Sequence, residues 1–412
     1  MQVKLSQVLK SLESGGRPKG GASIDNKGIP SLGAEHLNND GGFNFKSVKY
    51  IPAEYFNGMK NGIIENENIL IVKDGATTGK VSFVDIDFPF EKASVNEHVF
   101  LLKINESNAN PRYVFHYLKS PQGQRDILRD FRGATVGGIS RGFVDFVRFN
   151  LPSLPDQLQI ANLLSKAETL ISQRKESIRL LDQYLKSTFL EMFGDPVRNE
   201  KGWKICNLFE LGSLDRGVSK ARPRNSPELL GGIYPLIQTG DVTNSGVYIT
   251  TFKQTYSELG LKQSKLWPKG TMLITIAANI AQTSILSFDA CFPDSVVGFV
   301  TNSNKTRVLY VHFLFKFFQS LLERKASQTA QKNINLEILR NLKVPCPPIS
   351  LQTQFAQIVE KTEALKSQYQ QSLKELENLY SSLSQKAFKG ELTFKEEYLL
   401  QAAEPSMEYN KS

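Results

Sequence analysis

The chain has 412 residues, a formal net charge of +9 and an ordinary globular composition, with 40% hydrophobic and 22% charged residues. This length predicts two to four domains that each bury a core. There is no apolar stretch of about 18 residues and no basic start followed by an apolar run, which argues against a membrane span and a signal peptide. The three cysteines, Cys206, Cys291 and Cys346, are widely separated; this is typical of a reducing cytoplasm and argues against a zinc module or a disulfide framework.

The positive charge is concentrated in two segments that we expect to be globular. Residues 1–153 carry 19 basic and 16 acidic side chains, a net charge of +3. Residues 196–347 carry 19 basic and 10 acidic side chains, a net charge of +9, and the rest of the chain sums to −3. A basic globular surface suits the neutralisation of phosphates in nucleic acid. Many soluble proteins are equally basic without binding nucleic acid, so the charge alone leaves both interpretations open.

Residues 1–153 are predicted to form a mixed α and β domain. The apolar runs 69–72 and 99–102 indicate buried strands, because Gly, Asn and Asp bound them. Residues 113–130 have apolar side chains at helical spacing. The preceding Asn110-Pro111 indicates the start of this helix rather than the four-residue loop of amino-methyltransferases, which needs a second proline.

A long helix is predicted next, over residues 156–193. Asp156 with Gln159 three residues later is a plausible N-cap, and Gly194 and Pro196 would end the helix. At about 1.5 Å per residue it would be on the order of 57 Å long. Its apolar positions repeat with a period near 3.5 residues, which predicts a coiled-coil seam. The predicted seam residues of this helix are Ile171, Ile178, Leu181, Leu185 and Met192.

The second half of the chain repeats this order with divergent sequence. Residues 196–347 are predicted to form a second mixed domain, in which the apolar windows 272–286 and 308–318 are a core strand and a core helix. A second long helix is predicted from about residue 350 to 389, followed by an acidic tail from 393. The predicted seam residues of this helix are Tyr369, Leu373, Leu376, Tyr380 and Leu383.

The two long helices belong to an internal repeat. Residues 139–193 align without a gap with residues 334–388, 195 positions later, and 14 of these positions are identical. Because the seams match, we expect the helices to pair, and the order domain, helix, domain, helix predicts an antiparallel rod with a domain at each end. The alternative is that each helix packs only on its own domain. A pseudo-twofold chain suits a partner with two reading sites, such as duplex DNA.

Several motifs that suggest catalysis do not hold. Residues 75–81 resemble a phosphate-binding loop but are one residue too short between the glycines and have no Ser or Thr after Lys80. Pro293-Asp294 with Glu323 and Lys325 could form a nuclease pattern, but the last two fall in a predicted helix and the first half has no equivalent. The four histidines have no cysteines at ligand spacing. The sequence therefore predicts neither catalytic nor metal-binding residues.

Polar loops in both mixed domains are candidates for contact with nucleic acid. Each mixes Arg or Lys with Gln, Asn, Thr or Ser, and these side chains pair with guanine edges, adenine edges and phosphates. The alternative is that surface loops are usually polar. The candidates in the first domain are Arg17, Lys19, Lys73, Thr77, Thr78, Lys80, Arg132, Thr135, Ser140 and Arg141. The candidates in the second domain are Arg216, Lys220, Arg222, Arg224, Asn279, Gln282, Gln328, Gln331, Lys332 and Asn333.

Taken together, most of the chain resembles the specificity subunit of a type I restriction–modification system. The segments that carry the resemblance are the entries into the two helices, 151–157 and 344–349, and their endings, 189–196 and 386–392. Residues 133–140 resemble the family's loop before the last strand of a recognition domain. The second domain departs from this pattern, because its equivalent loop has no glycines.

The resemblance implies an α+β fold in which two target-recognition domains, 1–153 and 196–347, are separated by two long helices, 154–195 and 348–392, that pair as an antiparallel coiled coil. It implies that each domain reads one half of a bipartite DNA site, while the helices set the spacing and dock two DNA-methyltransferase subunits. Restriction (translocase–nuclease) subunits would complete the complex. The chain itself would be cytoplasmic, non-catalytic and free of cofactor, because S-adenosylmethionine and ATP with Mg²⁺ would be bound by the partners.

Two alternatives of other classes remain open at this point. The chain could be a methyltransferase or nuclease that acts alone, or a two-headed scaffold that binds proteins or sugars. Methylation by the purified chain would identify the first, and salt-sensitive, sequence-selective DNA binding would exclude the second.

Overall fold

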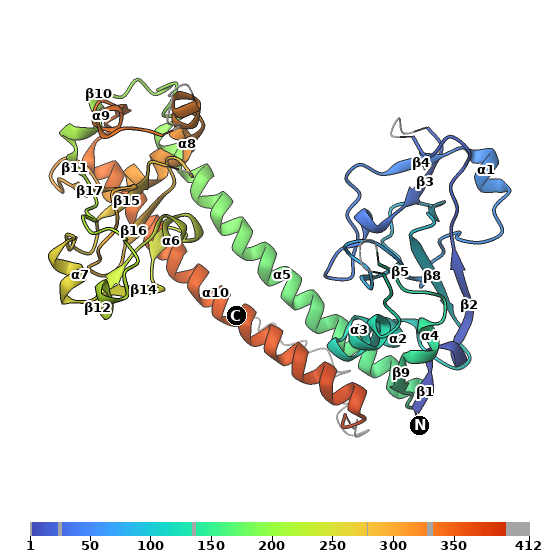
Figure 1. The fold of residues 1–412 in the computed structure, drawn as a ribbon. Helices are drawn as coiled ribbons and strands as arrows, with labels where there is room; N and C mark the ends of the chain where they lie inside the picture. The colour runs from blue at the N-terminus through green and yellow to red at the C-terminus, as the bar shows by residue number, and fades with distance from the viewer. Residues whose placement is uncertain (1, 24–26, 134–136, 278, 328–332, 393–412) are drawn as a thin grey trace, which may run out of the picture. The chain divides into compact units, whose positions relative to one another are not determined.

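The computed structural model describes residues 2–23, 27–133, 137–277, 279–327 and 333–392. They form two compact units: unit 1 comprises residues up to 173 together with those from 373 on, and unit 2 comprises residues 174–372. Two long helices, α5 (Leu154–Phe193) and α10 (Ile349–Lys389), each contribute one part to each unit (Figure 1).

Unit 1 is built on a four-stranded antiparallel sheet in the order β2-β8-β5-β6, with a three-stranded sheet β4-β3-β7 and a two-stranded ribbon β1-β9. Its strands are β1 (Gln2–Lys4), β2 (Leu9–Ser14), β3 (Ile29–Leu32), β4 (Lys49–Ile51), β5 (Ile69–Val72), β6 (Val81–Phe83), β7 (Ser94–Val95), β8 (Val99–Ile104) and β9 (Arg148–Asn150). Its helices are α1 (Ala53–Asn57), α2 (Pro111–Lys119), α3 (Pro121–Leu128) and α4 (Phe143–Phe146), with short 3-10 helices at Leu5–Gln7 and Ala34–His36.

Strand β5, one of the two inner strands of the four-stranded sheet, is buried on both faces, which explains its unbroken apolar sequence. Successive side chains of a strand point to opposite faces. Accordingly Ile69 and Ile71 belong to the core that includes helix α2, whereas Leu70 and Val72 belong to the core shared with β3 and β7. The sheet therefore separates two hydrophobic layers, and the predicted buried strands at 69–72 and 99–102 are confirmed.

Unit 2 repeats this architecture with a five-stranded sheet in the order β11-β17-β15-β16-β13, a ribbon β10-β18 and a pair β12-β14. Its strands are β10 (Ile205–Asn207), β11 (Gly212–Arg216), β12 (Leu230–Leu236), β13 (Tyr248–Ile249), β14 (Gln254–Tyr256), β15 (Met272–Thr275), β16 (Thr283–Leu286), β17 (Val296–Thr301) and β18 (Lys343–Pro345). Its helices are α6 (Thr239–Asn244), α7 (Glu258–Lys262), α8 (Val308–Ser327) and α9 (Leu336–Arg340), with 3-10 helices at Leu208–Glu210 and Pro227–Leu229.

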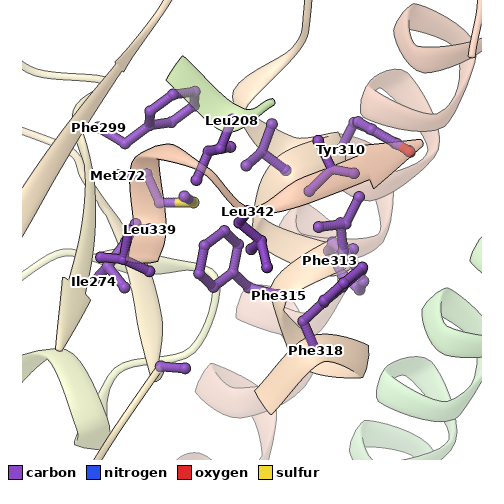
Figure 2. Packing of buried hydrophobic residues seen from close by; sticks show 14 of the residues in the cluster. Leu208, Met272, Ile274, Phe299, Tyr310, Phe313, Phe315, Phe318, Leu339 and Leu342 are labelled. Atoms are coloured by element: carbon purple, nitrogen blue, oxygen red, sulfur yellow. The ribbon is translucent and has the colours of Figure 1, made fainter. Parts of the chain in front are cut away.

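The core of unit 2 lies between this sheet and helix α8. Met272 and Ile274 of β15 pack in one cluster with aromatic residues of α8 (Figure 2). Leu273, which lies between them, belongs to a second cluster. Phe315 is fully buried, and truncating such a side chain to Ala typically costs about 3–5 kcal/mol. The core strand and core helix predicted at 272–286 and 308–318 are confirmed, with the strand divided into the hairpin β15-β16.

The two long helices pair antiparallel, as expected. In unit 2 the Arg174 guanidinium lies 4.3 Å from the centroid of the Tyr369 ring, and the ring centroids of Phe189 and Phe355 are 5.4 Å apart. The partner residue number falls as the α5 number rises, which defines the antiparallel direction. In unit 1 the start of α5 and the end of α10 share one core cluster, in which Ile160 and Leu164 pack with Ala387.

A row of buried or half-buried side chains runs along each helix in steps of three and four, which is the heptad pattern. The predicted seam residues all occupy such positions, and the skipped positions are filled by Arg174, Thr188 and Lys366. On α5 these positions are Gln157, Ile160, Leu164, Ala167, Ile171, Arg174, Ile178, Leu181, Leu185, Thr188 and Met192. On α10 they are Gln352, Phe355, Val359, Thr362, Lys366, Tyr369, Leu373, Leu376, Tyr380, Leu383 and Ala387.

Two local predictions were wrong. The helix expected over 113–130 is two helices, because Ser120 leaves the helical conformation before Pro121 and caps α3 by accepting a hydrogen bond from Gly123 N (3.1 Å). The first long helix begins at Leu154 rather than 156, and Ser153 in place of Asp156 accepts the capping hydrogen bond, from Asp156 N (3.3 Å). The predicted helix start at Asn110-Pro111 is confirmed.

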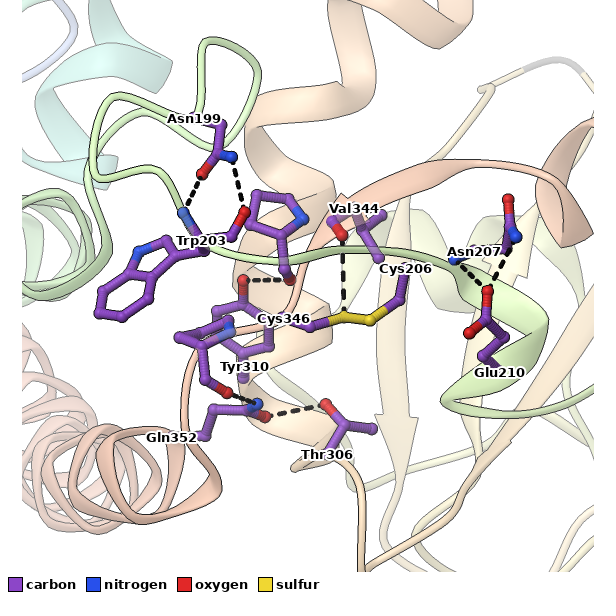
Figure 3. The surroundings of a disulfide bond; sticks show 12 residues. Asn199, Trp203, Cys206, Asn207, Glu210, Thr306, Tyr310, Val344, Cys346 and Gln352 are labelled. Carbon is purple, nitrogen blue, oxygen red and sulfur yellow. Dashed lines mark hydrogen bonds between the residues drawn. A yellow bond between two sulfur atoms is a disulfide. The ribbon is translucent and has the colours of Figure 1, made fainter.

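The prediction that the cysteines form no disulfide was also wrong. Cys206 and Cys346 are bonded, with their Cα atoms 6.2 Å apart, because the antiparallel pairing of β10 with β18 brings together segments 140 residues apart in the sequence (Figure 3). Such proximity cannot be recognised from the spacing of cysteines along the chain. Cys291 is free and buried.

Candidate nucleic-acid interface

Three loops of unit 1 meet at one edge of its four-stranded sheet. They are the loop after β2, the β5–β6 loop and the loop before α4 at about 132–141, of which 134–136 lie outside the described residues. The turn before β8 joins them, because Lys73 N donates to His98 O (2.8 Å). Ile139 N donates to Lys73 O (2.8 Å) and Gly75 N to Gly137 O (3.1 Å). The backbone thus fixes the positions of loops that are far apart in sequence.

Unit 2 makes the equivalent backbone hydrogen bonds, although the side chains around them differ. Ile276 N donates to Ser295 O (3.3 Å), and Ile334 N donates to Ile276 O (3.0 Å). Ile139 and Ile334 are an identical pair of the internal repeat, and both are buried. The repeat therefore preserves the residue that holds the third loop on the hairpin loop, while the polar residues around it differ.

A glycine brings the first loop against the turn in both units. A Cβ on Gly15 would lie 1.5 Å from Val95 O, and one on Gly217 would lie 2.2 Å from Phe292 O. Both glycines directly follow the first strand of their sheet, β2 or β11. Since no larger residue fits this close approach, the glycines were a signal for the position of the loop that sequence reasoning missed.

Two of the predicted cations of unit 1, Arg17 and Lys73, contact acidic residues. Arg17 Nε lies 3.1 Å from Glu97 Oε1, and Lys73 Nζ donates to Glu97 O (3.3 Å) and lies 3.9 Å from Asp74 Oδ2. His98 Nδ1 lies 2.6 Å from Asp74 Oδ1. Arg17 and Lys73 are therefore brought together, and the acids beside them were not among the predicted residues. Lys19 is exposed in the same loop as Arg17.

The remaining candidates of unit 1 separate into two groups. Thr77, Thr78 and Lys80 line a polar hollow of about 320 Å³ with Lys119 and Gln124 of the adjacent helices. The second group surrounds the buried carboxylate of Asp130.

Asp130 organises the second group. Ser140 donates to Asp130 Oδ2 through its backbone N (2.7 Å) and its hydroxyl (2.6 Å), and Arg132 Nη2 lies 2.9 Å from Asp130 Oδ1. Desolvation acts to raise the pKa of Asp130, but these donors hold it below its usual range. Ser140 therefore shapes the loop, whereas the Arg132 side chain remains 76% exposed. Arg141 donates to Leu12 O of β2.

The basic loop of unit 2 is held in the same way as that of unit 1. Arg224 Nη2 lies 2.7 Å from Asp294 Oδ1, and Arg222 Nη2 lies 3.9 Å from Asp294 Oδ2. Lys220 N donates to Gln263 O (3.3 Å), which ties the loop to the end of α7. Arg216 is exposed at the end of β11.

The hairpin loop of unit 2 carries two further candidates. Asn279 Nδ2 donates to Thr243 Oγ1 of α6 (3.3 Å), and Gln282 N donates to Thr275 Oγ1 (3.1 Å). Asn333 is half-buried beside Ile334. Four predicted residues lie outside the described residues, namely Thr135, Gln328, Gln331 and Lys332.

Sequence reasoning also missed a buried glutamine that joins each domain to its long helix. Gln157 Oε1 accepts from Asn110 N (2.8 Å) at the start of α2, and its Nε2 donates to Pro152 O (2.9 Å). Gln352 Oε1 accepts from Arg307 N (3.0 Å) before α8, and its Nε2 donates to Pro347 O (2.9 Å). Gln352 Oε1 also accepts from the hydroxyl of Thr306 (2.8 Å; Figure 3). Both glutamines are 1% exposed. We call these two contacts the polar joints; the signal for them was the identity of the glutamines in the repeat.

At each joint, a phenylalanine from the end of the other long helix packs on the domain. These two phenylalanines are again an identical pair of the repeat. Phe388 of α10 packs on Tyr113 of unit 1, with ring centroids 5.5 Å apart, and Phe193 of α5 packs on Tyr310 of unit 2 at 4.9 Å. Burial of these tyrosines raises the pKa of both phenols, whose hydroxyls donate to backbone carbonyl groups. Each domain is therefore clamped between the start of one helix and the end of the other.

Among the residues that the structure describes, there is no group of three or more His, Cys, Asp or Glu arranged to hold a metal ion. Burial lowers the pKa of His116 to about 4 and that of His312 well below its usual range, so both are neutral core residues that contact Ser165 and Thr283. Over the described ranges, the helices are also too short or too polar to cross a membrane.

Comparisons with known proteins agree with this picture. The family model described as the type I restriction modification DNA specificity domain matches residues 1–180 and 200–378. The type I restriction enzyme EcoBI specificity subunit of Escherichia coli is 23% identical over 336 residues, which cover 74% of this chain and 70% of the relative. The MjaVIII specificity subunit of Methanocaldococcus jannaschii is 21% identical over 379 residues, covering 82% and 85%.

A solved structure shows the same fold. The type I restriction–modification S subunit from M. genitalium superimposes with a TM-score of 0.62 at 15% sequence identity, and the match covers 96% of both chains. A chain from a structural study of type I complex assembly gives a TM-score of 0.57 at 18% identity and covers 95% of this chain. The fold of this chain, with its repeated mixed domain and its two long helices, is thus the fold of these two solved chains.

Because the family model covers most of the sequence, the chain belongs to the type I restriction modification DNA specificity family. It is a specificity subunit, the non-catalytic DNA-recognition component of a type I restriction–modification system. The resemblance noted in the sequence is confirmed, and a methyltransferase or nuclease acting alone is not favoured.

Proposed function

We propose that each unit reads one half of a bipartite DNA site with the three loops that meet at the edge of its main sheet. The observation that carries this proposal is the recurrence of the same backbone hydrogen bonds, around Ile139 and Ile334, beneath different polar side chains. A constant framework that carries different side chains is what two readers of different half-sites require. In this proposal the recognition domains are residues 1–153 and 196–347.

The paired helices, residues 154–195 and 348–392, set the spacing of the half-sites in this proposal and dock two DNA-methyltransferase subunits. The well-copied helix sequence supports it, because two copies of one partner need two equivalent surfaces. Restriction subunits join the complex through these partners. S-adenosylmethionine is bound by the methyltransferase subunits, which flip the target base out of the duplex, and ATP with Mg²⁺ is bound by the restriction subunits.

We infer the cellular location from the DNA partner and not from the cysteine content, because Cys206 and Cys346 are bonded to each other. A protein that reads genomic DNA acts where that DNA is, so we place the complex in the cytoplasm of its cell.

The decisive experiment is the methylation pattern of genomic DNA from a cell that carries this chain with its methyltransferase. We expect a two-part motif with a fixed gap, and loss of that motif when the gene for this chain is deleted. Methylation by the purified chain alone, or a motif that is unchanged after the deletion, would contradict the proposal. Purified complex should also bind DNA less tightly as salt rises, because phosphate contacts release counterions.

A further inference from the structure

The basic loop of each unit is paired with an acid at an equivalent position in the fold. Glu97 and Asp294 each lie two residues before the second strand of their sheet, β8 or β17. Glu97 contacts Arg17 from the loop after β2, and Asp294 contacts Arg224 from the loop after β11. The acids differ in type and the arginines differ in loop position, so the arrangement is shared although the sequences are not.

Both ion pairs remain accessible to a ligand. The side chains of Glu97 and Arg17 are 35% and 49% exposed, and those of Asp294 and Arg224 are 40% and 42% exposed. An incoming DNA duplex can therefore reach the arginines. It also meets a carboxylate within a few ångströms of each of them.

The geometry leaves each arginine with free donors. Arg17 contacts its acid through Nε, so both terminal nitrogens remain for a bidentate contact. Arg224 uses Nη2 for both Asp294 oxygens, which lie 2.7 and 2.9 Å away, so Nε and Nη1 remain, and each of these can donate a single hydrogen bond. Arg17 can thus bind a guanine edge through two hydrogen bonds, and Arg224 can donate single hydrogen bonds to base acceptors, while both stay paired with their acids. A phosphate group in the same position carries negative charge that the carboxylate repels.

We propose that Glu97 and Asp294 are specificity-determining residues, whose carboxylates hold the adjoining arginines for contact with bases and penalise their use for phosphates alone. A protein gains specificity by weakening the wrong complex as well as by strengthening the right one. This inference rests on the proposed reading of DNA by the loops. It adds two acidic residues to a candidate DNA interface that was predicted from basic and polar residues.

The test compares the full-length parent chain with the double variant Glu97→Gln and Asp294→Asn. A control variant, Glu106→Gln with Glu360→Gln, makes the same change in net charge. Glu106 follows the opposite end of β8 from Glu97, and Glu360 lies on α10; both are exposed. The probe is a labelled duplex of random sequence, titrated by fluorescence anisotropy at several salt concentrations. Thermal unfolding verifies that all three proteins are folded.

We expect the double variant to bind random-sequence duplex about two- to five-fold more tightly at each altered site, the range that an exposed ion pair spans. Its logarithmic salt dependence should steepen by up to about 0.9 for each arginine that gains a phosphate. Selection from a randomised duplex pool should give a weaker consensus, and Glu97→Gln alone should weaken only one half of it. The control should match the parent in all three measurements.

Affinity of the double variant for random DNA that is equal to or below that of the control would overturn the inference, as would an unchanged consensus. Failure of the proposed function has a different signature. In that case the parent chain itself binds random duplex without salt dependence and enriches no sequence, which overturns the reading of DNA by these loops together with the role of the acids.

Discussion

At the scale of single residues, the internal repeat marks the side chains that hold the structure and not those that we propose to read DNA. Gln157 and Gln352 make matching hydrogen bonds, and Phe193 and Phe388 make matching ring contacts. Within the loops, the shared residues Ile139 and Ile334 are likewise buried and structural, whereas the polar residues around them differ between the units. Residues that are identical in the two halves therefore have the same structural role in both units. The divergent residues form the surface that we propose reads DNA.

The buried His116 of unit 1 should make the stability of the folded chain sensitive to acid. The pKa of His116 is about 4 in the folded chain and near 6.5 when exposed, since burial disfavours the charged imidazolium. The unfolded state therefore binds a proton that the folded state does not, and the stability present above pH 6.5 is lost as pH falls toward 4. This group should remove about 2 kcal/mol from the free energy of unfolding between pH 7 and pH 5.

Denaturant unfolding of the parent and of His116→Phe at the two pH values measures this effect. Phenylalanine is a reasonable substitute because it fills a similar buried volume. The variant should lose about 2 kcal/mol less than the parent on acidification, although its stability at pH 7 is lower because it lacks the hydrogen bond with Ser165. Equal acid sensitivity of the two proteins would show that His116 is not the group responsible.

At the scale of elements, sequence periodicity predicted the helices and strands well and their interruptions poorly. The seams of α5 and α10 could be predicted because a heptad repeats over many turns. The break between α2 and α3 at Ser120 depends on one capping hydrogen bond and one proline, and a helical pattern of apolar residues continues across it. Contacts between distant segments, such as the bond between Cys206 and Cys346, leave no trace in local spacing.

The polar joints should be important for the stability of each domain on its helix. Replacing Gln157 by Leu leaves Asn110 N and Pro152 O without their buried partner, which should lower the free energy of unfolding by on the order of 2–4 kcal/mol. Gln354→Leu is the matched control, because Gln354 is exposed on α10. Chemical denaturation measures both. A loss in the control as large as that in Gln157→Leu would refute a special role for the joint.

The helix seam should determine the preferred gap between half-sites. Leu181→Asp together with Leu376→Asp places carboxylates among partly buried seam positions and should cost on the order of 2 kcal/mol at each. The control is Leu180→Asp with Leu379→Asp, at neighbouring positions that are 48% and 50% exposed. The measurement is methylation by the complex of DNA substrates with different gaps. We expect the seam variant to lose its gap preference and the control to keep it; the same preference in both would argue against a spacing role.

At the scale of the whole molecule, the two units should act on DNA as separable readers. Arg222→Ala with Arg224→Ala removes two cations from the loop of unit 2 only. Binding to a target with both half-sites should weaken by about 1–3 kcal/mol for each arginine that binds a base, or the salt slope should fall by about 0.9 for each arginine that binds a phosphate. Titrations with DNA targets altered in only one half-site show which half-site unit 2 recognises.

A control for this variant is Lys253→Ala, which removes an exposed cation from another loop of unit 2. If the arginine variant weakens recognition of both half-sites equally, the assignment of one half-site to each unit is wrong. At this scale the sequence predicted the duplication, the antiparallel helices and the family. It did not predict which loops meet, because the hydrogen bonds around Ile139 and Ile334 join segments that are about sixty residues apart.

The clamping of unit 1 by Phe388 has a consequence for biosynthesis. Phe388 O accepts a hydrogen bond from Asn150 Nδ2, across 238 positions of the chain, whereas unit 2 is assembled from one uninterrupted segment. A ribosome therefore delivers everything that unit 2 requires before unit 1 receives its last layer. The first domain to emerge is the last to be completed, and a nascent chain that stops short of its final helix exposes the apolar faces of Tyr113 and Tyr117 to chaperones.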